Sequence, residues 1–173
     1  MTSAERLTKT AWQARREGRH GDAERSLLEA IAVSREAGLR IDLIQALKAL
    51  AHVARDLGQI ERALPLYEEA VTLSREEGDA LLLAHTVRHL GDLHREASRD
   101  KEARRCYQEA LFLYQTASNV PPLEFANALR PAAILTEAEG DFEAARQLWS
   151  EALRLYQAAG VREGVEECER RIA

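Results

Sequence analysis

Several features that would assign the sequence to a common class are missing from it. There are only two cysteines, Cys106 and Cys168, and their separation forms no metal-binding spacing. We therefore expect two reduced thiols, as in a cytoplasmic protein. The first residues form no apolar signal segment, and no apolar run is long enough to cross a bilayer. These absences predict a cytoplasmic protein without a secretory leader or a membrane partner.

An excess of positive charge is also missing. The chain has 24 Lys and Arg against 29 Asp and Glu, which gives a net charge of −5 at pH 7. Nucleic-acid binding usually needs a basic surface, so we expect no nucleic-acid partner. The sequence contains no glycine-rich phosphate loop, no nucleophile elbow and no His-Glu-x-x-His motif. We therefore predict that the protein is not an enzyme and holds no cofactor.

Aromatic residues and helix breakers are scarce. Aromatics make up 5% of the chain, which has four prolines and nine glycines, and Ala, Leu, Glu and Arg dominate. This composition favours helix, because these side chains lose little freedom there. Pro131 falls inside one of the expected helices, where proline removes a hydrogen bond and crowds the previous turn. We expect a kink between Asn127 and Pro131, although neighbouring residues could also absorb the defect.

A unit of helix, turn and helix is repeated four times. The alanine that opens each second helix recurs at intervals of 40, 40 and 42 residues. A large apolar residue follows four positions later and another alanine seven positions later, so that a neighbouring helix can approach closely around a bulky centre. These triplets are Ala23-Leu27-Ala30, Ala63-Tyr67-Ala70, Ala103-Tyr107-Ala110 and Ala145-Trp149-Ala152. The residues that end the second helices are Gly38, Gly78, Asn119 and Gly160, and the matching small residues of the first helices are Ala11, Ala51, Gly91 and Ala133.

These residues resemble the tetratricopeptide repeat (TPR) family. The unit is longer than the common 34 residues and is similar to those of Pins-type adaptors, kinesin light chains and bacterial TPR regulators. The resemblance implies an all-α fold, a right-handed α-α superhelix (solenoid) of four TPR helical hairpins in a single domain, 1–173. The expected repeats are 5–38, 39–78, 79–119 and 120–160. We interpret 161–173 as a short capping helix, with the start of a further unit as the alternative.

The resemblance also implies a scaffold or adaptor that binds a protein or peptide on a concave groove lined by the first helices. Steps of three and four residues along these helices select the side chains that face inward. Among them, six Lys or Arg stand against three Asp or Glu, so we predict a basic groove that binds an acidic segment. The candidate partner-binding residues are Trp12, Arg15, Lys48, His52, Arg55, His85, Arg88, Arg95, Asn127 and Arg130.

Other interpretations of the same residues stay open. The arginines could belong to a solvated face and pair with acids such as Asp56 and Glu96. The chain could associate with itself through an exposed end of the solenoid, or act as the regulatory TPR module of a signalling system. His85, His89 and Asp92 have a spacing that could bind a metal ion, but no second cluster completes the site, and we predict no metal.

Overall fold

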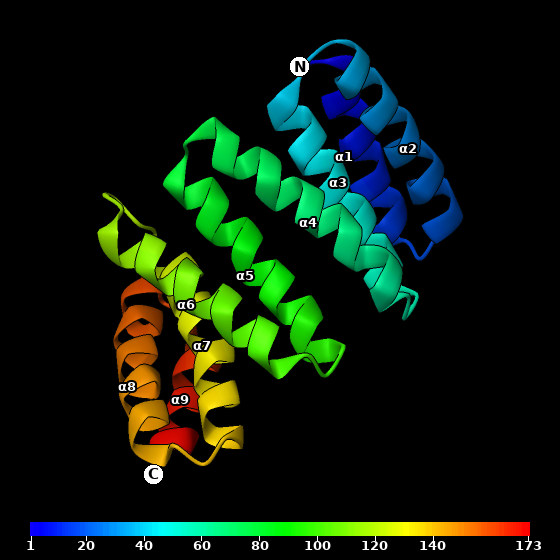
Figure 1. Cartoon of the computed structure of the whole chain (residues 1–173). Helices are drawn as coiled ribbons and strands as arrows, with labels where there is room; N and C mark the ends of the chain where they lie inside the picture. Colours follow the sequence, from blue (N-terminus) through cyan, green and yellow to red (C-terminus); the bar gives the residue numbers. More distant parts are fainter. The chain divides into compact units, whose positions relative to one another are not determined.

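The computed structural model describes residues 1–173 and contains only α-helices (Figure 1). Helices α1 to α8 form four successive hairpins, each closed by a short turn, and α9 follows the last hairpin. The helices are α1 (Ser3–Arg16), α2 (His20–Glu36), α3 (Arg40–Asp56), α4 (Ile60–Glu77), α5 (Ala80–Glu96), α6 (Asp100–Thr116), α7 (Pro122–Ala138), α8 (Phe142–Ala159) and α9 (Arg162–Ile172). The all-α class and the four hairpins expected from the sequence are confirmed.

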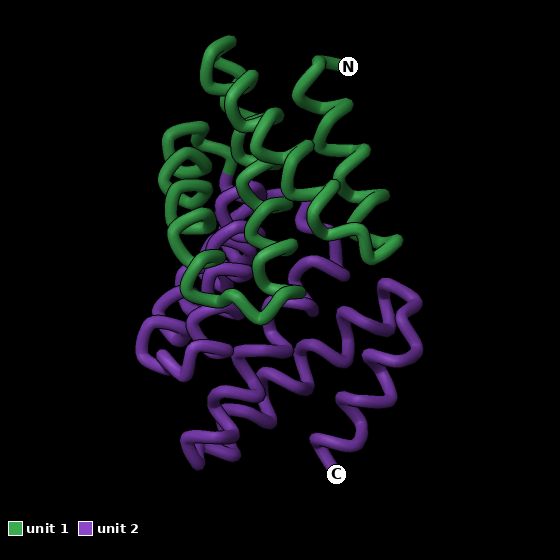
Figure 2. The backbone as a smooth tube through the Cα atoms, turned by 90° about the vertical axis from the view of Figure 1, so that its right-hand side faces the viewer, with its two compact units in different colours: residues 1–79 green, residues 80–173 purple.

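The helices divide into two compact units, unit 1 with residues 1–79 and unit 2 with residues 80–173 (Figure 2). In unit 1, α1 pairs with α2 and α3 with α4, and α3 also packs against α1 and α2. In unit 2, α5 pairs with α6 and α7 with α8, while α6 packs against α7 and α9 against α8. Each unit therefore contains two hairpins, and unit 2 has one additional helix.

A residue with positive φ lies in every connection between two helices. Six of these residues are glycines, and the other two are Ser98 and Asn119, each with φ of 57°. Glycine adopts this left-handed conformation without a steric penalty from Cβ. At Gly38 the turn lets the amide of Leu39 donate to the carbonyl of Ser34 at 2.9 Å, which closes α2. The turns predicted from the repeat are thus confirmed.

The bulky residue at the centre of each second helix fills the core of its hairpin. All four of these residues are at most 2% exposed, and the alanines on either side of them are equally buried. Because alanine is small, the first helix can approach closely and leave no void around the large side chain. The four central residues are Leu27, Tyr67, Tyr107 and Trp149.

Three of these central residues also carry a polar atom, and each bonds to the first helix of its own hairpin. A buried polar group needs such a partner to offset the loss of water. The pairs are the Tyr67 hydroxyl with Nε2 of His52 at 2.9 Å, the Tyr107 hydroxyl with Oδ1 of Asp92 at 3.0 Å, and Nε1 of Trp149 with Oε1 of Glu137 at 2.8 Å. The core therefore holds three polar side chains of the first helices in place.

Pro131 does not interrupt α7, which runs as one helix from Pro122 to Ala138. The residue is buried within the helix. The helix is continuous across the proline, and the kink expected between Asn127 and Pro131 stays a prediction. Asn127 and Pro131 therefore both lie within α7, the first helix of the fourth hairpin.

Helix α9 covers the open side of the last hairpin. Cys168 is fully buried, and Val165 and Ile172 pack beside it against the cluster that contains Trp149. The other side of α9 is polar, with Glu166 and Glu169 exposed. This side has no apolar stripe, and the interpretation of 161–173 as a capping helix stays a prediction.

Gly164→Ala is expected to destabilise unit 2, because a Cβ at this position would lie 2.6 Å from the ring of Tyr156. The Tyr156 ring is 3% exposed and its hydroxyl donates to Asn127, so it has little room to move. Overpacking lowers the free energy of unfolding by about 1–3 kcal/mol, which exceeds the gain of ~1 kcal/mol from alanine's helix propensity.

Gly21→Ala is the matched control for this change, because a Cβ there would meet nothing within 4 Å. We expect this second variant to be neutral or more stable. Thermal unfolding followed by circular dichroism measures both variants, and equal shifts in melting temperature would contradict tight packing at Gly164.

Candidate functional site

The ten residues predicted to bind a partner lie on the first helices of the hairpins. Five belong to each of the two units. Those of unit 1 are Trp12, Arg15, Lys48, His52 and Arg55. Those of unit 2 are His85, Arg88, Arg95, Asn127 and Arg130.

Trp12 and Arg15 form a cluster on α1. The guanidinium carbon of Arg15 lies 5.0 Å from the centre of the Trp12 ring. Its Nε and Nη2 donate to the carboxylate of Asp56, at the end of α3, at 2.5 and 2.8 Å. These hydrogen bonds hold the pKa of Asp56 below its ordinary value, against the effect of burial. The charge of Arg15 is therefore paired with Asp56, which agrees with the alternative that the arginines pair with nearby acids. Trp12 is half-buried.

His52 and Lys48 lie on α3 in the same unit. The His52 ring is 5.5 Å from the Trp12 ring and stands edge-on to Tyr67 at 5.7 Å. Lys48 is only 7% exposed. Arg55 lies in the last turn of α3. The structure thus revises the place of Lys48, which is buried instead of lying on an open basic surface.

Arg88 is the centre of a buried polar network on α5. It is 9% exposed, and its Nη2 and Nη1 lie 2.8 Å from Nε2 of His89 and 3.4 Å from Oδ2 of Asp92. Burial disfavours the ionised form of Asp92, but the hydrogen bond from His89, the charge of Arg88 and the Tyr107 hydroxyl together keep its pKa below the ordinary value. Arg88 therefore compensates a buried carboxylate, and its expected place on an open groove is also revised.

Arg130 and Asn127 on α7 are held by other helices of unit 2. Arg130 donates to both carboxylate oxygens of Glu167 on α9, at 2.6 and 3.0 Å. This bond lowers the pKa of Glu167. The side chain of Asn127 accepts a hydrogen bond from the Tyr156 hydroxyl at 3.0 Å. The positive charge of Arg130 is therefore balanced within the unit.

Arg95 differs from these arginines because it has no carboxylate partner. Its one polar contact joins Nε to the Tyr107 hydroxyl at 3.4 Å. The residue lies in the last turn of α5 and is half-buried. The structure thus leaves one predicted arginine of unit 2 with an uncompensated charge.

His85 and His89 lie side by side on α5, with ring centres 4.6 Å apart. Nε2 of His85 is 4.0 Å from a carboxylate oxygen of Glu124, and His89 is bonded to Arg88. No group of three or more His, Cys, Asp or Glu side chains is placed to hold a metal ion.

The two cysteines are free thiols. Burial raises the pKa of both Cys106 and Cys168 to about 11. Both are therefore protonated near neutral pH and are poor nucleophiles and metal ligands.

A pocket of about 350 Å³ opens beside Trp12, between α1 and α3. Lys9 and Arg16 line it, three residues before and four residues after Trp12, so the three side chains lie on neighbouring turns of one helix face. Both cations are exposed and neither has a carboxylate partner. The sequence reasoning missed them because it followed a single stripe along α1. Their spacing from Trp12 was the signal that could have found them.

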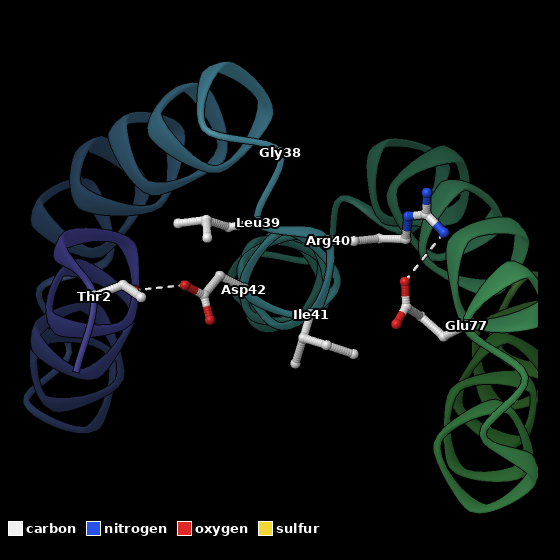
Figure 3. Close-up of a pocket in the computed structure, with 7 residues that line it drawn as sticks. All are labelled: Thr2, Gly38, Leu39, Arg40, Ile41, Asp42 and Glu77. Atoms are coloured by element: carbon white, nitrogen blue, oxygen red, sulfur yellow. Dashed lines mark hydrogen bonds and ion pairs between the residues drawn. The ribbon is translucent and has the colours of Figure 1, made fainter.

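A larger pocket of about 550 Å³ lies at the end of α3 in unit 1. Its polar side chains are bonded to one another: the Thr2 hydroxyl donates to Asp42 at 2.5 Å, and Arg40 pairs with Glu77 at 3.2 Å. Figure 3 shows that Asp42 and Arg40 point to opposite sides of α3, toward these two partners. No set of polar groups converges on a common point there, so this pocket is a weaker candidate than the one beside Trp12.

The family model of the tetratricopeptide repeat matches residues 11–76 and 42–116, which together are more than half of the chain. The chain therefore belongs to the tetratricopeptide repeat family, as the repeat pattern predicted. No curated protein sequence matches it.

Solved structures with this fold include aspartyl phosphate phosphatase F from Bacillus subtilis, 20% identical with a TM-score of 0.87, and the apo form of RapI, 15% identical with a TM-score of 0.87. Each match covers 96% of this chain, which spans 43% and 60% of the two neighbours. BtubC (BKLC) from P. vanneervenii is 22% identical with a TM-score of 0.76, and the match covers 96% of this chain and 77% of that one.

At these identities the likeness concerns the fold, that of TPR repeat proteins. TPR repeats present helix faces to other proteins, so the chain is a protein-interaction scaffold in this general sense. None of its helices combines the length and the apolarity that crossing a bilayer requires.

Proposed function

We propose that the chain binds an acidic segment of a partner protein on the first helices of its hairpins and catalyses no reaction. The observation that carries this proposal is Arg95, a half-buried cation without a carboxylate partner on a chain of net charge −5. A partly desolvated charge interacts more strongly with an incoming carboxylate than a fully hydrated one does. Exposed Lys9 and Arg16 supply further positive charge on α1.

The other predicted residues contribute to this role in different ways. Trp12 supplies an aromatic contact of the kind that is enriched in binding hot spots. Arg15 and Arg130 are paired, so they add hydrogen-bond donors and little net charge. His52 and Arg55 contribute on α3 of unit 1, and His85 and Asn127 contribute on α5 and α7 of unit 2. Lys48 and Arg88 are buried, so they contribute as internal side chains of α3 and α5.

The proposal also treats residues 1–173 as one domain that acts in the cytoplasm. The overlapping family matches support a single domain, because the second match, residues 42–116, continues through the boundary between the two units in the sequence. The two free thiols support a reducing compartment.

Arg95→Glu is expected to weaken binding of an acidic partner by tenfold or more, because loss of a charged hydrogen bond alone changes affinity by about 1.5–3 kcal/mol. The partner is first captured from a lysate of the source organism with the wild-type chain, and its affinity for each variant is then measured by titration calorimetry. Circular dichroism checks the fold, and Arg95→Lys should retain part of the affinity because it keeps the charge.

Arg154→Glu is the matched control, since Arg154 is an exposed arginine without a carboxylate partner on the second helix α8 of the same unit. It should leave the affinity unchanged. A partner that binds the Arg95→Glu variant as tightly as the wild type would overturn the proposed binding surface.

A further inference from the structure

We propose that the pocket beside Trp12 in unit 1 binds a tyrosine side chain of the partner segment, with acidic residues flanking this tyrosine. This inference rests on the proposed function, because it names the residue of the acidic partner segment that binds in one pocket of the first helices.

The pocket has a size that suits a single large side chain. Its volume of about 350 Å³ lies at the small end of the range for ligand pockets. Thr8 and Trp12 line it from α1 and Gln45 from α3, and most of the lining is apolar. A side chain that enters it would therefore exchange water for apolar contacts on two helices of one compact unit.

The Trp12 ring is held in a fixed orientation. The Arg15 guanidinium lies 5.0 Å from its centre and is itself anchored by two hydrogen bonds to Asp56. The His52 ring lies 5.5 Å away at 52° and is bonded to Tyr67. A rigid aromatic wall favours an aromatic ligand, which can stack with an offset or place its edge against the ring.

The Thr8 hydroxyl favours tyrosine over phenylalanine. Five other threonines within helices donate to the carbonyl four residues earlier, as a threonine in a helix usually does. Thr8 is an exception: it lines the pocket, is 8% exposed and has no hydrogen-bond partner. Rotation about its Cα–Cβ bond would direct the hydroxyl into the pocket, where a phenolic hydroxyl can both donate and accept.

The charges around the opening favour acidic neighbours of the tyrosine. Lys9 and Arg16 stand on either side of Trp12 and have no carboxylate partner. Of the two acids of the lining, Glu5 forms an ion pair with the N-terminal ammonium at 3.9 Å, whereas Asp42 accepts only a neutral hydrogen bond from the Thr2 hydroxyl and keeps its charge. Lys9 and Arg16 thus stand against one carboxylate without a cationic partner, so the net charge at the opening is positive and attracts acidic residues beside the bound ring.

Three peptides test the pocket: acetylated, amidated pentapeptides with tyrosine, phenylalanine or alanine between two pairs of glutamates. Each is titrated into the isotope-labelled full chain and followed by NMR through the two indole N–H signals. We expect the tyrosine peptide to shift the Trp12 signal and leave the buried Trp149 signal in place, and to bind at least tenfold tighter than the alanine peptide. An alanine peptide that binds equally well, or a tyrosine peptide that shifts neither signal, would overturn the proposal.

Two variants of the pocket sharpen the test. Thr8→Val, which keeps the side-chain shape, should remove a preference of roughly three- to tenfold for tyrosine over phenylalanine, the size expected from one hydrogen bond. Trp12→Ala should weaken the tyrosine and phenylalanine peptides alike and leave the alanine peptide unchanged. A wild type that binds both aromatic peptides equally well, or a Thr8→Val variant that still prefers tyrosine over phenylalanine, would contradict the role of Thr8.

The proposed function and the pocket can fail separately. If Arg95→Glu weakens the captured partner while Trp12→Ala and Thr8→Val have no effect on any peptide, the pocket proposal fails and the acidic-partner function stands. If the peptides respond as expected but the captured partner is insensitive to Arg95→Glu, the pocket stands and the wider binding surface is wrong.

Discussion

Replacing Trp149 with alanine is expected to lower the free energy of unfolding by about 3–5 kcal/mol, the usual effect of removing a large buried aromatic side chain. Trp149 is fully buried in a cluster with four alanines of α7 and α8, which cannot move inward far enough to close the cavity. The change also leaves Glu137 without the indole N–H at 2.8 Å, and removes the ring over which Arg171 lies at 5.6 Å. Urea denaturation followed by circular dichroism measures the loss.

Phe142→Ala is the matched control for this prediction, because Phe142 begins the same helix and is 72% exposed. It should change the free energy of unfolding by less than about 0.5 kcal/mol. Trp149→Phe should fall between the two variants, since it keeps most of the ring and loses the hydrogen bond. A Trp149→Ala variant as stable as Phe142→Ala would contradict a central role of this side chain in the hairpin.

The hairpins and their cores could be predicted from the sequence because local rules determine them. Each second helix has alanine, a bulky residue and alanine at fixed spacing, and each turn has a residue that tolerates positive φ. Both signals lie within one helix or one turn, so they need no knowledge of distant parts of the chain. The same reasoning predicted the last helix, α9, because Val165, Cys168 and Ile172 lie on one stripe.

The electrostatic state of the first helices could not be predicted in the same way. Lys48, Arg88 and Arg130 occupy equivalent repeat positions, so the sequence presented them as a row of similar cations. Their surroundings differ, because Arg130 meets Glu167 from a helix 37 residues away. Arg88 is buried beside an aspartate that also accepts a hydrogen bond from the second helix. Repeat position predicts which way a side chain faces, whereas its charge balance depends on the helices packed around it.

Asp92→Ala is expected to destabilise unit 2 by about 3–5 kcal/mol, because it leaves the guanidinium of Arg88 buried without its carboxylate. The Tyr107 hydroxyl, which donates to Asp92 at 3.0 Å, loses its acceptor as well. Asp22→Ala is the matched control, since it breaks only surface pairs with Arg19 and Arg25 and should leave the free energy of unfolding nearly unchanged. Equal effects of the two variants in urea denaturation would contradict the buried network.

A double variant separates the loss of the pair from the loss of its charges. Arg88→Met combined with Asp92→Leu removes both charges and fills the space with apolar side chains. It should recover most of the stability that Asp92→Ala loses, because replacing a whole buried pair is far less disruptive than removing one partner. A double variant that is no more stable than Asp92→Ala would show that the unpaired arginine is not the cause of the loss.

The pH dependence gives an independent measurement of the same network. The pKa of Asp92 is lowered in the folded chain, so its ionised form contributes stability that is fully present above the ordinary aspartate pKa of about 3.9. This contribution disappears as the pH falls through the lowered pKa, because the wild-type carboxyl then becomes protonated. The difference in unfolding free energy between the wild type and Asp92→Ala should therefore be largest above about pH 4 and narrow below it. A difference that stays constant down to pH 2 would show that Asp92 acts through packing and not through its charge.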